Sequence, residues 1–145
     1  MLETIDVIFD NMTEMMKKLK KDTYEKNMSI FRNKHGHYFE EMITLVEQSE
    51  DRDATVNEIA NVFIESINSK FSVKGKMKPR TEADLTLFMI YYVFPALLLT
   101  ESDYAVTIAN SIRDAWRIRA NNYKFQYTDY NKIYNSFRDK IFGIF

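Results

Sequence analysis

Side chains that could bind a metal ion occur close together at one place in this sequence: His35, His37, Glu40 and Glu41. Imidazole and carboxylate groups are common ligands of zinc, iron and manganese. Helical di-iron proteins, however, use Glu-x-x-His pairs on facing helices, and no such pair occurs here. Because Gly36 separates the two histidines and predicts a helix end, the sequence does not fix their geometry. We therefore expect neither a metal nor another cofactor, and we interpret the cluster as an exposed helix cap.

Motifs for other kinds of catalysis are missing from the sequence. The chain has no cysteine, no Gly-x-Ser-x-Gly elbow and only 2 histidines that could act as a base near neutral pH. Its 3 glycines are too far apart in the sequence to form a phosphate-binding loop. We therefore predict no catalytic residue, and no motif supports an enzyme.

The composition also bears on where the protein acts. Without cysteine the chain can form neither a disulfide framework nor a thiolate metal site. The first residues, MLETIDVIFDNM, are acidic and amphipathic, unlike the cationic start of a secretory signal. We therefore expect a cytoplasmic protein.

Basic side chains gather in two stretches, although the 20 basic and 21 acidic residues give a net charge of only -1. The first stretch, residues 70–80, has no acidic residue. The second consists of Arg113, Arg117, Arg119 and Lys124 beside Trp116. Such patches can bind nucleic acid or another polyanion, although a solvated loop and a solvated helix face are the more common explanations. The candidates for anion binding are Lys74, Lys76, Lys78, Arg80, Arg117 and Arg119.

Large apolar side chains are abundant, with 11 Phe, 9 Tyr and 1 Trp, and the chain ends in an apolar segment. More large side chains than one small core can hide would leave an exposed patch, and such patches usually mark an interface. Homo-oligomerisation or binding of a protein partner is therefore the leading hypothesis for function. The interface candidates are Ile141, Phe142, Ile144 and Phe145.

The segment Leu85–Leu99 carries no charge and is almost entirely apolar. At about 1.5 Å per residue it would span about 22 Å as a helix, less than the roughly 30 Å of a bilayer core. It is therefore predicted to be a buried central helix, about 82–99, opened by a capping run at 81–84, and no membrane span is expected. Pro95 predicts a kink. A small-molecule or enzymatic pocket at this kink, lined by Tyr91, Tyr92 and Pro95, is a further alternative.

Apolar residues at three- and four-residue steps predict the other helices. A first stripe begins at Leu2, runs on through Phe31 and should stop near Gly36, and a shorter stripe covers 38–46. A helix at about 54–70, capped by Asp53, a helix that starts after a second capping run at 100–103, and a last helix within 129–142 complete the pattern. The prediction is a single all-α domain, 1–145, with five to six helices around the central one.

The second half of the chain contains YYVFPALL at 91–98, then Trp116, and then two segments at 130–133 and 137–143. In these features, over roughly residues 85–143, it resembles a family of small helical bacterial proteins without a known function. It implies a helical fold and leaves the activity open.

Overall fold

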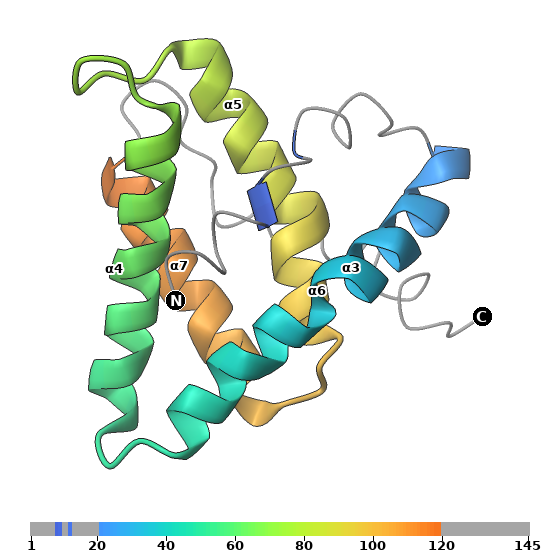
Figure 1. Cartoon of the computed structure of the whole chain (residues 1–145), viewed down its shortest axis with the longest axis vertical. Helices are drawn as coiled ribbons and strands as arrows, with labels where there is room; N and C mark the ends of the chain where they lie inside the picture. The colour runs from blue at the N-terminus through green and yellow to red at the C-terminus, as the bar shows by residue number, and fades with distance from the viewer. Residues whose placement is uncertain (1–7, 10–11, 13–20, 120–145) are drawn as a thin grey trace.

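The structure is a computed structural model that describes residues 8, 9, 12 and 21–119 (Figure 1). Every regular element in this part is helical, so the all-α class is confirmed. A π-helical turn, η1, joins α5 to α6 without a break, and the described part therefore contains four helices. The predicted helix within 129–142 lies outside the described residues. The elements are α3 Lys21–Glu47, α4 Arg52–Phe71, α5 Pro79–Phe88, η1 Met89–Val93, α6 Phe94–Leu98 and α7 Asp103–Arg119.

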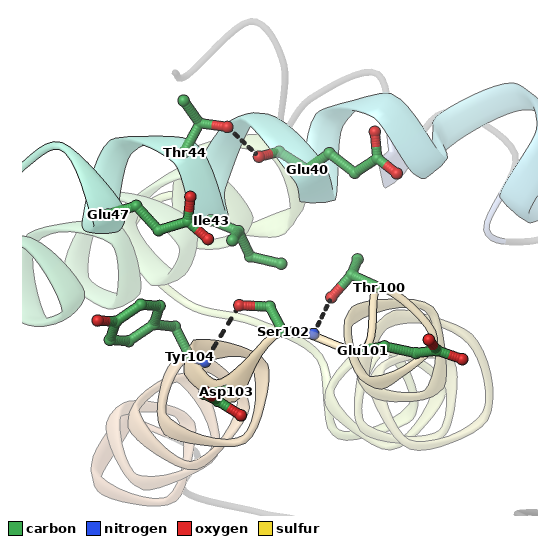
Figure 2. A pocket seen from close by; sticks show the side chains of 9 residues that line it. All are labelled: Glu40, Ile43, Thr44, Glu47, Thr100, Glu101, Ser102, Asp103 and Tyr104. Carbon is green, nitrogen blue, oxygen red and sulfur yellow. Dashed lines mark hydrogen bonds between the residues drawn. The ribbon is translucent and has the colours of Figure 1, made fainter.

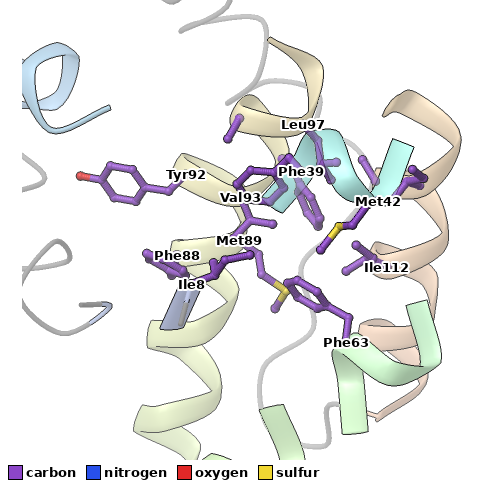
Figure 3. Packing of buried hydrophobic residues seen from close by; sticks show 14 of the residues in the cluster. Ile8, Phe39, Met42, Phe63, Phe88, Met89, Tyr92, Val93, Leu97 and Ile112 are labelled. Atoms are coloured by element: carbon purple, nitrogen blue, oxygen red, sulfur yellow. The ribbon is translucent and has the colours of Figure 1, made fainter. Parts of the chain in front are cut away.

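The central helix, Pro79–Leu98, is buried among the other helices as predicted. Its completely buried side chains point in several directions, and Ile8, Phe39, Phe63 and Ile112 from the rest of the chain lie in the same cluster (Figure 3). By length and composition this stretch could also cross a membrane, but 67% of its apolar window is buried in the fold, as in the core helix of a globular protein. The helix begins at Pro79 after an N-cap at Lys78, so the predicted capping run at 81–84 lies inside its first turn.

Helix α3 runs straight through Gly36, which corrects the predicted stop and the exposed cap at His35 and His37. His35 is only 1% exposed and continues the apolar stripe. Its ring lies 5.1 Å from that of Phe31, and the Phe31 ring lies 6.0 Å from that of Phe39. A mid-helix glycine costs about 1 kcal/mol relative to alanine, which the burial of these rings outweighs.

Helices α4 and α7 lie side by side and run in the same direction. Arg52 contacts Tyr104 at their first turns, and Asn68 contacts Arg119 at their last turns. Helix α4 starts earlier than predicted, because the carboxylate of Asp51 rather than Asp53 caps it by accepting from the Ala54 N–H at 3.1 Å. Helix α7 turns back from α6 after a short connection, as predicted, and so brings its own two ends to opposite ends of the molecule (Figure 1).

Where the kink was predicted, the helix contains a π-helical turn, Met89–Val93, which ends two residues before Pro95. In a regular α-helix the Tyr91 carbonyl would accept a hydrogen bond from residue 95, and proline has no N–H. The hydroxyl of Tyr24 on α3 donates to that carbonyl instead. The π-helical turn is therefore supported by a side chain of the neighbouring helix α3.

Candidate functional site

An open groove lies between the C-terminal half of α3 and the connection from α6 to α7 (Figure 2). Its volume of about 500 Å³ falls in the range of ligand-binding sites. Four of the nine residues that line it carry carboxylates, and none is basic; we call this site the acidic groove. The lining residues are Glu40, Ile43, Thr44, Glu47, Thr100, Glu101, Ser102, Asp103 and Tyr104.

One wall of the acidic groove is a single face of α3. Its four residues are spaced i, i+3, i+4 and i+7, which places them on one side of a helix. Ile43 points towards the opposite wall, while the Thr44 hydroxyl donates to the Glu40 backbone carbonyl at 3.0 Å (Figure 2). The wall therefore places Ile43, which is only 6% exposed, between Glu40 and Glu47.

The backbone holds the other wall in place. Glu101 has a φ of 61°, in the left-handed region that costs a non-glycine residue about 1–2 kcal/mol. Its N–H donates to the Leu98 carbonyl at 3.1 Å, which helps to end α6. The Ser102 hydroxyl accepts from the Tyr104 N–H at 3.2 Å and caps α7. These bonds fix the connection that carries Glu101 and Asp103.

The carboxylates stand around the acidic groove rather than meeting at one point (Figure 2). Within the described residues, no group of three or more His, Asp or Glu side chains is placed to hold a metal ion. At the edge of the groove, the Arg52 guanidinium lies 5.2 Å from the Tyr104 ring centroid and donates to the Glu47 carbonyl at 3.4 Å. Spread negative charge around an apolar side chain suits a basic protein segment better than a metal ion.

The first predicted basic stretch forms a tight turn between α4 and α5. The N–H of Val73 donates to the Lys76 carbonyl at 2.8 Å, and the N–H of Lys76 donates back at 3.1 Å. Both central residues, Lys74 and Gly75, have positive φ values of 53° and 76°, as in a type I′ turn. We call Val73–Lys76 the basic turn. Its lysines are exposed, as are Lys78 and Arg80.

The second predicted basic stretch lies at the same end of the molecule. Arg119, at the end of α7, donates a hydrogen bond to the side-chain oxygen of Asn68, one turn before α4 ends. Arg117 is exposed beside it. The tertiary structure thus joins two stretches that are about 40 residues apart in the chain. We call this surface the basic end; it consists of Lys74, Lys76, Lys78, Arg80, Arg117 and Arg119.

Not every cation of the basic end is equally available. Arg80 forms an ion pair with Asp84, with 3.3 Å between nitrogen and oxygen. Two aliphatic side chains are exposed beside the cations, Val73 at 67% and Ile118 at 86%. Trp116 is only 1% exposed, and its indole N–H donates to the Thr86 hydroxyl at 2.8 Å. The indole therefore belongs to the core and offers no stacking surface to a nucleic-acid base.

The residues of the predicted pocket at the helix bend lie in or beside the core. Tyr92 and Pro95 are buried and Tyr91 is half-buried. The Tyr24 ring packs on both tyrosines, with centroid distances of 6.0 Å to Tyr91 and 5.6 Å to Tyr92. The acidic groove lies elsewhere, at the end of α6 and the start of α7. A ligand pocket at the bend stays a prediction.

The predicted histidine and glutamate cluster is divided between two sides of α3. His35 is buried against the core, whereas His37, Glu40 and Glu41 are exposed. Glu40 therefore lines the acidic groove, whereas His35 lies in the core. The interface candidates Ile141, Phe142, Ile144 and Phe145 lie outside the described residues.

The acidic groove was not predicted from the sequence. Its carboxylates belong to stretches interpreted as a polar helix face and as a capping run. One signal could have drawn attention to it: the last turn of α3 contains Glu47 and no basic residue. Cations stabilise a helix C-terminus, so the negative charge of Glu47 does not stabilise α3.

Comparisons with protein-family models, with curated proteins and with solved structures returned no match.

Proposed function

We propose that this protein is a non-catalytic binding protein that acts through contacts with other protein chains, including further copies of itself. The acidic groove carries this proposal, because four of its nine lining residues carry carboxylates and none is basic. A basic segment of a protein can place its cations on the rim and an apolar side chain against Ile43. The proposal includes a cytoplasmic location and five to six helices in the whole chain, as expected from the sequence.

The test is a titration with a fluorescein-labelled, lysine-rich peptide, followed by fluorescence anisotropy at an ionic strength of about 0.025 M. We expect binding that weakens with added salt. The double variant Glu40→Gln/Glu101→Gln should bind about fivefold more weakly, since two exposed ion pairs are lost. Glu25→Gln is the matched control, because Glu25 is exposed on α3 and lies outside the acidic groove. Equal binding by the double variant and the wild type would show that the groove is not the site.

Polyanion binding through the basic end is the second candidate function. The observation that favours it is the convergence of the two basic stretches through the Arg119–Asn68 hydrogen bond. Titration with labelled single-stranded DNA and RNA should give an affinity that falls steeply with salt. Replacing Lys74 and Arg117 by Gln should lower the affinity, and Lys34→Gln, an exposed lysine on α3, is the control. The absence of a salt-dependent signal with the wild type would reject this function.

A further inference from the structure

We propose that the acidic groove of one copy receives the basic turn of a second copy, so that the chains associate head to tail. This inference rests on the proposed function and names the partner of the same groove. It follows from three properties of the described residues: complementary charge, exposed apolar surface beside that charge, and the position of the two surfaces at opposite ends of α7.

The charges of the two surfaces are opposite. The acidic groove offers the carboxylates of Glu40, Glu47, Glu101 and Asp103. The basic turn offers Lys74 and Lys76, both exposed, and no acidic residue lies between Lys70 and Arg80. Opposite charges steer encounter and set the register of docking, while like charges suppress wrong arrangements.

The apolar parts also correspond. Val73, at the base of the basic turn, is 67% exposed, although valine is a residue that folded proteins usually bury. In the acidic groove, the half-buried Tyr104 ring provides most of the apolar surface, since Ile43 is only 6% exposed. Docking would cover Val73 while both lysines stay on the rim, where their charges keep partial contact with water.

The basic turn is already in one defined shape. Its two reciprocal backbone hydrogen bonds, at 2.8 and 3.1 Å, close a four-residue loop beyond the end of α4 (Figure 1). A rigid turn loses less conformational entropy on docking than a flexible segment does. In the acidic groove, the wall formed by the connection from α6 to α7 is likewise fixed, by the capping hydrogen bonds of Ser102 and Glu101.

The position of the two surfaces makes the contact intermolecular. The acidic groove includes the first turn of α7, and the basic end includes its last turn. These turns are separated by a helix of 17 residues, which is about 25 Å long. A chain therefore cannot place its own basic turn in its own groove. Different surfaces meet in such a contact, so it repeats from copy to copy and gives rings or open chains rather than a two-fold dimer.

The experiment is a charge exchange followed by sedimentation velocity at about 0.025 M and about 0.3 M ionic strength. The groove variant is Glu40→Lys/Glu101→Lys, and the turn variant is Lys74→Asp/Lys76→Glu. All four residues are exposed, so both variants should fold, as circular dichroism will verify. Glu25→Lys and Lys34→Glu, at exposed positions outside both surfaces, are charge-matched controls.

We expect the mean mass of the wild type to rise above 17.3 kDa with concentration at the lower ionic strength and to return to this value at the higher one. Each variant alone should stay at the monomer mass. The groove variant keeps only Glu47 and Asp103 beside two lysines and so has no net negative charge to attract the basic turn, and the turn variant carries charge of the same sign on both surfaces. An equimolar mixture of the two variants should again form at least dimers, since the unchanged groove of the turn variant meets the unchanged basic turn of the groove variant. The controls should assemble like the wild type.

Three results would overturn the inference: a wild type that stays monomeric at low ionic strength, variants that assemble as well as the wild type, or a mixture that fails to assemble. The peptide titration distinguishes a failure of head-to-tail association from a failure of the proposed function, which is the binding of basic protein segments by the acidic groove. A monomeric wild type that still binds the lysine-rich peptide through Glu40 and Glu101 would show that the groove takes a different protein. Assembly that persists in both variants would place self-association on another surface, such as residues 141–145.

Discussion

At the scale of single residues, the hydroxyl of Tyr24 replaces a hydrogen bond that Pro95 removes from the central helix. It donates to the carbonyl of Tyr91, the group that a residue with an N–H at position 95 would satisfy. A hydrogen bond of this kind contributes about 0.5–1.5 kcal/mol to stability. This hydrogen bond is therefore expected to stabilise the packing of α3 on the π-helical turn η1.

Tyr24→Phe removes this donor and keeps the ring in the core. We expect the free energy of unfolding to fall by about 0.5–1.5 kcal/mol, measured by urea denaturation. The control is the same change in a Pro95→Ala background, where the restored N–H can serve the Tyr91 carbonyl and the loss should be smaller. An equal loss in both backgrounds would show that the hydroxyl and Pro95 are not coupled.

Alkaline pH should weaken the fold through the same residue. Burial raises the pKa of Tyr24, and the nearby Tyr92 and Tyr91 raise it further. An unfolded tyrosine titrates near pH 10, so this contribution to stability is complete below about pH 10 and is lost as the pH rises towards the folded pKa. Burial also raises the pKa of Tyr92, which a hydrogen bond from Asn27 partly offsets.

The free energy of unfolding should therefore fall above pH 10, by at most about 1.4 kcal/mol per pH unit for each such tyrosine. Urea denaturation at several pH values between 8 and 11 measures this slope. In Tyr24→Phe the slope should be smaller and should not vanish, because Tyr92 remains. A wild type with the same stability across this range would contradict the burial of the Tyr24 hydroxyl.

At the scale of elements, the apolar stripe of α3 has more influence than Gly36 on where the helix ends. Gly36 has the local signature of a helix end, yet residues on both sides of it pack on the central helix and on one another. The Phe31 ring lies 5.6 Å from that of Phe88 and also from that of Tyr92. Ending the helix at Gly36 would break this set of contacts.

Gly36→Ala distinguishes the two interpretations of this position. A Cβ atom built at Gly36 meets nothing within 4 Å, so alanine fits in the continuous helix. We expect thermal denaturation to show a gain in stability of about 0.5–1 kcal/mol, the difference in helix propensity. A loss of stability would instead indicate a left-handed cap at this position, where a Cβ atom is unfavourable.

At the scale of the whole molecule, a net charge of -1 conceals a separation of charge between two ends. The acidic groove lies where α3 ends and α7 begins, and the basic end lies where α4 and α7 end. The parallel packing of α4 on α7 produces this arrangement, because it brings their last turns together. Such a distribution gives the protein one attractive face for cations and another for anions.

Ion-exchange chromatography at pH 7 and low salt should reveal this separation. We expect the wild type to be retained by a cation exchanger despite its negative net charge. Lys74→Gln/Lys76→Gln should elute at lower salt from the cation exchanger, whereas the matched variant Lys34→Gln should change its elution less. Passage of the wild type without any retardation would contradict a concentrated basic end.

The sequence alone determined which residues form helices and which of their faces are buried. Val56, Ile59 and Phe63 on α4 are buried where the three- and four-residue period placed them. The uncharged stretch from Leu85 became the central helix for the same reason, since its apolar side chains have few alternatives to burial. Helix ends were less predictable: the start of α4 at Arg52 and the passage through Gly36 depend on capping and packing partners.

Only the tertiary structure decided the candidate sites. The acidic groove combines a face of α3 with a connection that follows it by more than 50 residues, and the basic end combines two stretches from different helices. Periodicity shows that a charged face points to solvent, but it does not show which other charged face lies beside it. The packing of the buried faces determines which charged faces lie side by side. It therefore places the acidic groove at one end of α7 and the basic end at the other.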